Sequence, residues 1–198
     1  DWSVASSVSA LSSGLYQFQS YAAKGRGLMV NPSSILGNVD SLLGNPLALA
    51  NSVINMFSGF SSGYSSNADL NNNFTTLTGY ASTMPRTVAG TGTTPARRQE
   101  STNNAALETL MRGAALGNAA AVSSLMPLPV YDDAIANRNT MTAALDAESL
   151  TAPDTLFTAI TDLRTKVHQD ITERGKGAAR MRTVTMPEVR PSLVVAYD

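Results

Sequence analysis

The chain has 198 residues, of which 43% are hydrophobic and only 6% aromatic, so it can bury a core built mainly from aliphatic side chains. Its formal net charge of −1 argues against a large constitutive surface for nucleic acid. With no cysteine and a single histidine, His168, the sequence excludes disulfides, thiolate metal sites and histidine-rich metal sites. No uninterrupted apolar run reaches about 18 residues, so we expect no membrane-spanning helix.

The charged side chains are distributed unevenly along the chain. Of 14 basic and 15 acidic side chains, only five lie in residues 1–85. A soluble domain usually exposes more charge than this. Either the segment is flexible low-complexity sequence, or its surface is hidden against other subunits. Its apolar residues recur at helical spacing, which favours the second interpretation, with residues 1–82 as a charge-poor helical assembly region.

Successive helices are predicted within this region. Residues 4–21 place one apolar side chain on each turn of a single helical face, at Val4, Val8, Leu11, Leu15 and Phe18. Two further helices are expected after Pro32 and Pro46, because proline fixes a φ angle that suits a first helical turn.

The end of the charge-poor region has a different composition. Residues 57–73 are rich in Ser, Gly and Asn, which is typical of a loop or a frayed helix. Residues 74–81 are predicted to form one more helical segment with Phe74, Leu77 and Tyr80 on its buried side. Residues 83–99 contain Pro85, Pro95 and several Thr and Gly, so we expect a linker there.

Residues 100–180 are predicted to form a three-helix module. Apolar residues recur at steps of three and four from Leu107 to Leu125, from Ile135 to Leu145 and from Leu156 to Ile171. The breaks are expected near Pro127 and Pro129 and again across residues 149–153.

Local signals refine this three-helix prediction. Thr151 is expected to cap the third helix, with Pro153 tolerated in its first turn. Gly113 and Gly117 lie four residues apart, and glycine within a helix costs roughly 1 kcal/mol relative to alanine. We expect close approach of another helix to that face as the compensation.

After Gly175 the glycine-rich break ends the long helix, and residues 181–198 are predicted to be extended because they combine prolines with β-prone Leu and Val. The whole sequence therefore predicts a mainly α protein with helical bundle-like modules and an extended C-terminal segment. Since the chain begins with Asp1 and not with Met, we expect it to be a piece of a longer protein, truncated after this last segment as well.

The one pattern that suggests catalysis is G-x-S-x-G at residues 59–63. A nucleophile elbow needs a strand before it, a helix after it, and an acid and a histidine later in the chain. Here a Ser- and Gly-rich stretch follows, and the single histidine is embedded in a predicted helix. We therefore expect no enzyme activity, no cofactor and no metal site.

A group of basic residues late in the chain is the one electrostatic feature that suggests a ligand. Contact with nucleic-acid phosphates is one interpretation. Acidic residues are interleaved with the group, as on an ordinary solvated helix face, so a structural role toward acidic neighbours is the other interpretation. The candidate nucleic-acid contacts are Arg164, Lys166, Arg174, Lys176, Arg180 and Arg182.

From Ala105 to Asp198 the sequence resembles the later region of the Mu-type phage DNA circularisation proteins, which are also described as tail or baseplate proteins. Short matches occur in order along this region. They are Ala105-Ala106-Leu107-Glu108, Arg112-Gly113-Ala114-Ala115-Leu116, Tyr131-Asp132-Asp133-Ala134 with Arg138, Leu145-Asp146-Ala147-Glu148, Leu163-Arg164, Asp170-Ile171-Thr172-Glu173-Arg174-Gly175, Arg182-Thr183-Val184-Thr185 and Pro191-Ser192-Leu193-Val194-Val195-Ala196-Tyr197.

The resemblance implies a structural component of a contractile tail, placed in the virion baseplate near the hub and the tube end. Such a protein is made in the bacterial host cytoplasm and works by subunit packing, with hub, tube and tape-measure proteins as partners and homo-oligomers expected. The family name implies an alternative role, in which the protein travels with ejected phage DNA and holds its linear ends together as a circle. The resemblance transfers no catalytic residue.

Overall fold

The computed structural model describes residues 46–181, and this part of the chain is mainly α-helical. Its helices are α4 (Pro46–Ser62), α5 (Asn67–Thr83), α6 (Pro95–Leu125), α7 (Tyr131–Ser149) and α8 (Asp154–Gly175). Within these residues the only β pairing is one isolated parallel bridge, between Val130 and Ala179. The mainly α prediction is confirmed. The helices expected before residue 46 and the extended segment after residue 181 lie outside the described residues.

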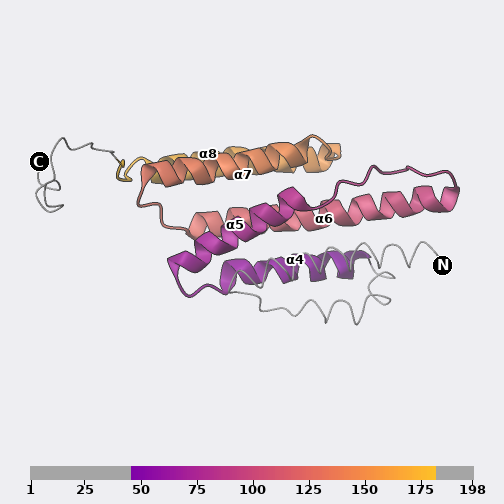
Figure 1. Ribbon diagram of the computed structural model, residues 1–198, viewed down its shortest axis with the longest axis horizontal. Helices are drawn as coiled ribbons and strands as arrows, with labels where there is room; N and C mark the ends of the chain where they lie inside the picture. The colour runs from indigo at the N-terminus through magenta and orange to yellow at the C-terminus, as the bar shows by residue number, and fades with distance from the viewer. Residues whose placement is uncertain (1–45, 182–198) are drawn as a thin grey trace, which may run out of the picture.

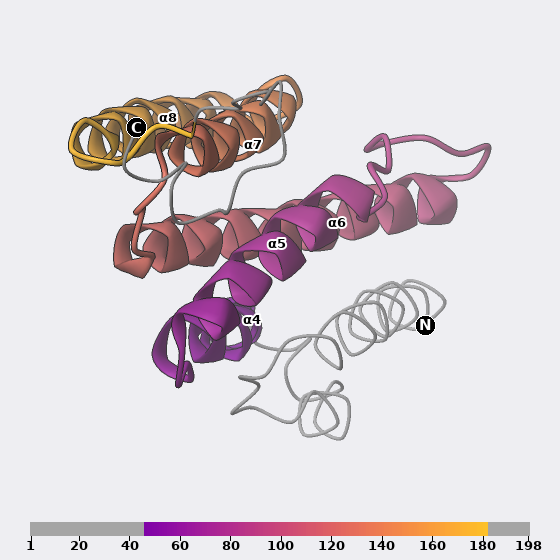
Figure 2. The same ribbon diagram turned by 60° about the vertical axis from the view of Figure 1, so that its left-hand side comes forward.

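The long helix α6 is the element on which the others pack. Helices α7 and α8 lie side by side along one side of it, and α4 and α5 lie on the other (Figures 1 and 2). The N-terminal turns of α6 project beyond the other helices in both views. None of the helices in residues 46–181 combines the length and the apolarity that a membrane span requires.

The α4–α5 side is held to α6 by aromatic side chains. Phe57, Phe60, Phe74 and Tyr80 are all fully or almost fully buried, and the rings of Phe57 and Tyr80 lie 5.4 Å apart in a tilted arrangement. Burial raises the pKa of the Tyr80 hydroxyl, which donates a hydrogen bond to the sulfur of Met111 on α6. The predicted buried side of residues 74–81 is therefore confirmed.

Residues 57–73, predicted to be a loop or a frayed helix, are mostly regular helix in the structure. Helix α4 continues to Ser62 and α5 begins at Asn67, so only residues 63–66 separate them. Burial of Phe60 and Leu70 outweighs the weak helix propensity of the Ser, Gly and Asn around them. The side-chain amide of the buried Asn73 also donates to the Phe60 carbonyl, which satisfies one C-terminal carbonyl of α4.

Helix α6 begins earlier than predicted. The Thr94 hydroxyl accepts a hydrogen bond from the Arg97 N–H, and Pro95 occupies the first turn. The non-helical connection is thus residues 84–94, whereas the expected linker ran over residues 83–99.

The three helices predicted after residue 100 are confirmed, and both breaks fall where prolines interrupt the chain. Thr151 is not the N-cap of α8, however. The residue before a proline is disfavoured in the helical region, so α8 starts only after Pro153, and the Pro153 carbonyl accepts from Phe157 N–H. The Thr151 hydroxyl instead accepts a hydrogen bond from Arg86.

Candidate functional site

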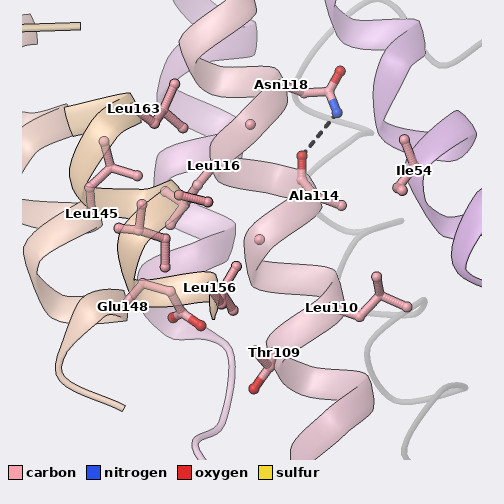
Figure 3. Close-up of a pocket in the computed structure, with 14 residues that line it drawn as sticks. Ile54, Thr109, Leu110, Ala114, Leu116, Asn118, Leu145, Glu148, Leu156 and Leu163 are labelled. Carbon is pink, nitrogen blue, oxygen red and sulfur yellow. Dashed lines mark hydrogen bonds between the residues drawn. The ribbon is translucent and has the colours of Figure 1, made fainter. Parts of the chain in front are cut away.

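A hollow lined almost entirely by apolar side chains lies over the middle of α6. It has a volume of about 450 Å³ and is lined by residues of α4, α6, α7 and α8. Ile54 stands on one side of α6, and Leu145, Leu156 and Leu163 stand on the other (Figure 3). We call this hollow the α6 groove.

The floor of the α6 groove contains Gly113 and Gly117. A Cβ atom built on either glycine meets no heavy atom within 4 Å. The close helix approach predicted for these glycines is therefore wrong for the described residues. Because the two glycines have no side chain, they leave a depression on α6 in which another backbone can approach closely.

Several leucines on the predicted apolar helix faces line the groove and are not fully buried. Leu110, Leu156 and Leu163 are half-buried, although each lies on the apolar face of its helix. Ile54 on α4 is 44% exposed, whereas its neighbour in sequence Val53 is fully buried. The apolar faces of three helices thus converge on a surface that the described residues leave open.

One wall of the groove contains a buried carboxylate. Glu148 of α7 is fully buried, and its Oε2 accepts hydrogen bonds from Arg112 Nε at 2.7 Å and from Arg86 Nη1 at 2.8 Å. The other oxygen, Oε1, has no hydrogen-bond partner among the described residues. A buried acceptor without a donor is costly, so Glu148 Oε1 carries a desolvation cost that the described residues do not compensate.

The same carboxylate belongs to a buried ionic network that fastens three elements together. The Arg112 side chain, 3% exposed, also donates to the Pro85 carbonyl and to the Thr109 hydroxyl. Glu108, one turn before Arg112, accepts from the N–H and the hydroxyl of Thr87. Segment 84–94, α6 and α7 are therefore held in one register by charged side chains.

In the sequence, Arg112, Glu108 and Glu148 stand out only as part of the family resemblance, which implies no role for them. A usable signal was present, because Glu108 and Arg112 are an i, i+4 charge pair inside an apolar and alanine-rich run. The partner on α7 could not be inferred, since it depends on tertiary packing.

The basic residues proposed as nucleic-acid contacts are mostly engaged within the protein. Arg164 pairs with Asp146 of α7, and Lys176 pairs with Glu173 on its own helix. The Arg180 guanidinium lies 4.5 Å from the centre of the Tyr131 ring.

The Arg174 side chain donates hydrogen bonds to carbonyls at the C-terminus of α6. Its Nη1 donates to the Met126 carbonyl at 2.8 Å and its Nη2 donates to the Ser123 carbonyl at 2.7 Å, while Asp170 balances its charge. The carbonyls at a helix C-terminus carry partial negative charge, so a guanidinium there is favourable. Lys166 is exposed and forms no ion pair with the described residues, and Arg182 lies outside them.

The catalytic pattern at residues 59–63 lies at the C-terminal end of α4. Ser61 is in the last turn of that helix, where its hydroxyl donates to the Ser58 carbonyl at 2.9 Å. A helix, not a strand, precedes the serine, so the local geometry differs from a nucleophile elbow. His168 is exposed on α8, and residues 46–181 contain no cluster of His, Asp and Glu that could hold a metal ion.

Comparison of the chain with models of protein families, with curated proteins and with solved structures finds no match.

Proposed function

We propose that this chain is a structural component of a contractile phage tail baseplate, placed near the hub and the tube end, which acts through packing of its helices against other subunits. The ordered matches to the Mu-type DNA circularisation proteins from Ala105 onward support the assignment to a tail. Its partners are then hub, tube and tape-measure proteins together with further copies of the chain.

The use of charge in the described residues is the observation that favours a structural role. Arg112 and Glu148 join α6 to α7, Arg164 joins α8 to α7, and Arg174 joins α8 to α6. These contacts fasten helices to each other and so stabilise the relative position of the elements. Such a body suits a connector, which must hold one shape while its surfaces contact neighbours.

The direct test locates the chain in the particle. Purified tails and capsids from the phage that encodes this sequence are analysed by mass spectrometry, and tails are imaged at a resolution that places helices. We expect the chain in tails and absent from tail-free capsids, with density for α6–α8 at the baseplate. A chain found only in infected cells and never in tails contradicts the proposal.

The alternative is binding of phage DNA ends, for which exposed Lys166 is the favourable observation. Phosphate binding releases counterions, so affinity for linear DNA should fall steeply as salt rises. Lys166→Glu should then weaken binding, whereas Asp162→Asn, which removes a neighbouring negative charge, should strengthen it. This role for α8 is excluded if no DNA binding is detected at 50 mM salt, or if both variants bind DNA with the same affinity as the natural sequence.

A further inference from the structure

We propose that the α6 groove is the docking site of the chain's own residues 4–21, which bind as an amphipathic helix with its apolar face on Gly113 and Gly117. Docking of this segment does not depend on the proposed role in a phage tail. It assigns an occupant to a surface that the described residues leave open.

The shape of the groove fits a helix. A helix packs closely on another where small residues let the two backbones approach, and both glycines have free space above them. Ile54 on one side and Leu156 and Leu163 on the other would flank the incoming helix (Figure 3). These side chains are half-buried or exposed now and would be covered by it.

The chemistry of the segment matches that of the groove. Residues 2–23 contain no charged side chain, so none would have to be desolvated on an apolar surface. Projected on a helix, the series Val4, Val8, Leu11, Leu15 and Phe18 forms one face. Ser7, Ser12 and Gln19 border that face and carry uncharged hydrogen-bonding groups.

The length of the chain allows the segment to reach the groove. Residues 22–45 lie between the segment and α4, and 24 residues can span up to about 80 Å when extended. The floor of the groove, residues 109–118 of α6, is only about 15 Å long. A covalently linked segment has an effective concentration in the millimolar range, which favours it over the same segment of a second copy.

Thiol labelling of the full chain tests the proposal, because the natural sequence has no cysteine. Ala159→Cys places a thiol on the wall of the groove and leaves both glycines unchanged. We expect its reaction with a maleimide probe to accelerate about tenfold when Leu11→Asp and Leu15→Asp are added, since an undocked segment no longer protects it. The charge-matched control, Ser13→Asp with Gln17→Asp on the opposite face, should leave the rate unchanged.

A second control and a cross-link separate the remaining outcomes. Ala143→Cys, exposed on α7 and outside the groove, should label at one rate in all backgrounds. Mild oxidation of the Leu15→Cys, Ala159→Cys double variant should give a disulfide within one chain, seen as a faster monomer band on a non-reducing gel, and Leu15→Cys with Ala143→Cys should not. Equal labelling of Ala159→Cys in all backgrounds without a cross-link overturns docking. A disulfide-linked dimer assigns the groove to a second copy and overturns the proposed occupant.

Discussion

The two pairs of helices that flank α6 are held to it by different interactions. On the α4–α5 side, buried aromatic rings such as Phe57, Phe74 and Tyr80 fill the contact. On the α7–α8 side the buried residues are aliphatic and smaller, and charged groups cross between helices at Arg112 and Arg174. Burial of apolar surface contributes a large free energy but does not depend on direction. Charge-assisted hydrogen bonds do depend on direction, so they fix the position of one helix along another. We therefore expect the first contact to be sensitive to lost volume and the second to unpaired charge.

The largest effect is expected from loss of an aromatic ring on the α4–α5 side. Phe57→Ala removes a fully buried side chain and should lower the free energy of unfolding by about 3–5 kcal/mol, measured by urea denaturation. Phe157→Ala on α8 is the matched control, because that ring is 48% exposed, and its cost should stay below about 1 kcal/mol. Similar losses for both variants would contradict the assignment of the aromatic core.

On the α7–α8 side, Arg112→Met should lower the free energy of unfolding by about 3 kcal/mol, because Glu148 is left buried with only Arg86 beside it. Replacing both partners, Arg112→Met with Glu148→Met, should recover most of this loss, because no unpaired carboxylate remains. A double-mutant cycle measures the recovery. Strictly additive losses would show that the pair does not act as a unit.

A smaller effect is expected where Arg174 meets the C-terminus of α6. Arg174→Met removes two charge-assisted hydrogen bonds to the carbonyls of Ser123 and Met126, and the cost should be about 1–2 kcal/mol. Lys176→Met, which breaks only an exposed pair with Glu173, should cost less than about 0.5 kcal/mol. Equal and small losses of unfolding free energy in the two variants would show that Arg174 contributes no more than an ordinary surface residue.

The helix breaks on this side could be predicted because proline acts locally. Pro127 and Pro153 each end or delay a helix through their fixed φ and their effect on the preceding residue. The Ser- and Asn-rich stretch around Phe60 was predicted wrongly for the opposite reason. Its helical state depends on burial of Phe60 and Leu70 in the core, which cannot be inferred from local helix propensity.

The candidate site could be predicted only in part. The sequence places Leu110, Leu156 and Leu163 on apolar helix faces. The same spacing of apolar residues occurs whether such a face is buried or lines an open groove. It likewise identifies Arg174 as basic without showing that its guanidinium turns toward α6. Which charged side chains remain available to a ligand is decided by tertiary partners that lie up to 65 residues away in the chain.

Gly117 lies on the side of α6 that neither pair of helices covers. If the α6 groove is open, Gly117→Ala should raise the free energy of unfolding by about 1 kcal/mol through helix propensity alone. If residues 4–21 dock on this glycine, the added methyl group meets them and the gain should vanish. The gain should then return in the Leu11→Asp, Leu15→Asp background, and thermal denaturation of the four variants measures it.

The smallest effect on stability is expected at the start of α5. Hydrogen bonds from the Ser65 hydroxyl, then from the Ser66 hydroxyl and the Ser65 N–H, lower the pKa of the Asp69 carboxyl. Because the folded pKa lies below the unfolded value of about 3.9, this stabilisation is present above the unfolded pKa and is lost as pH falls through the folded pKa.

Ser65→Ala should raise the pKa of Asp69, as followed by NMR titration, and its small destabilisation should disappear in acid below both pKa values. Ser62→Ala, whose hydroxyl donates only to the Ser58 carbonyl, should leave that titration unchanged. A pKa of Asp69 that stays low without the Ser65 hydroxyl would show that the backbone at the start of α5 suffices to hold the carboxylate.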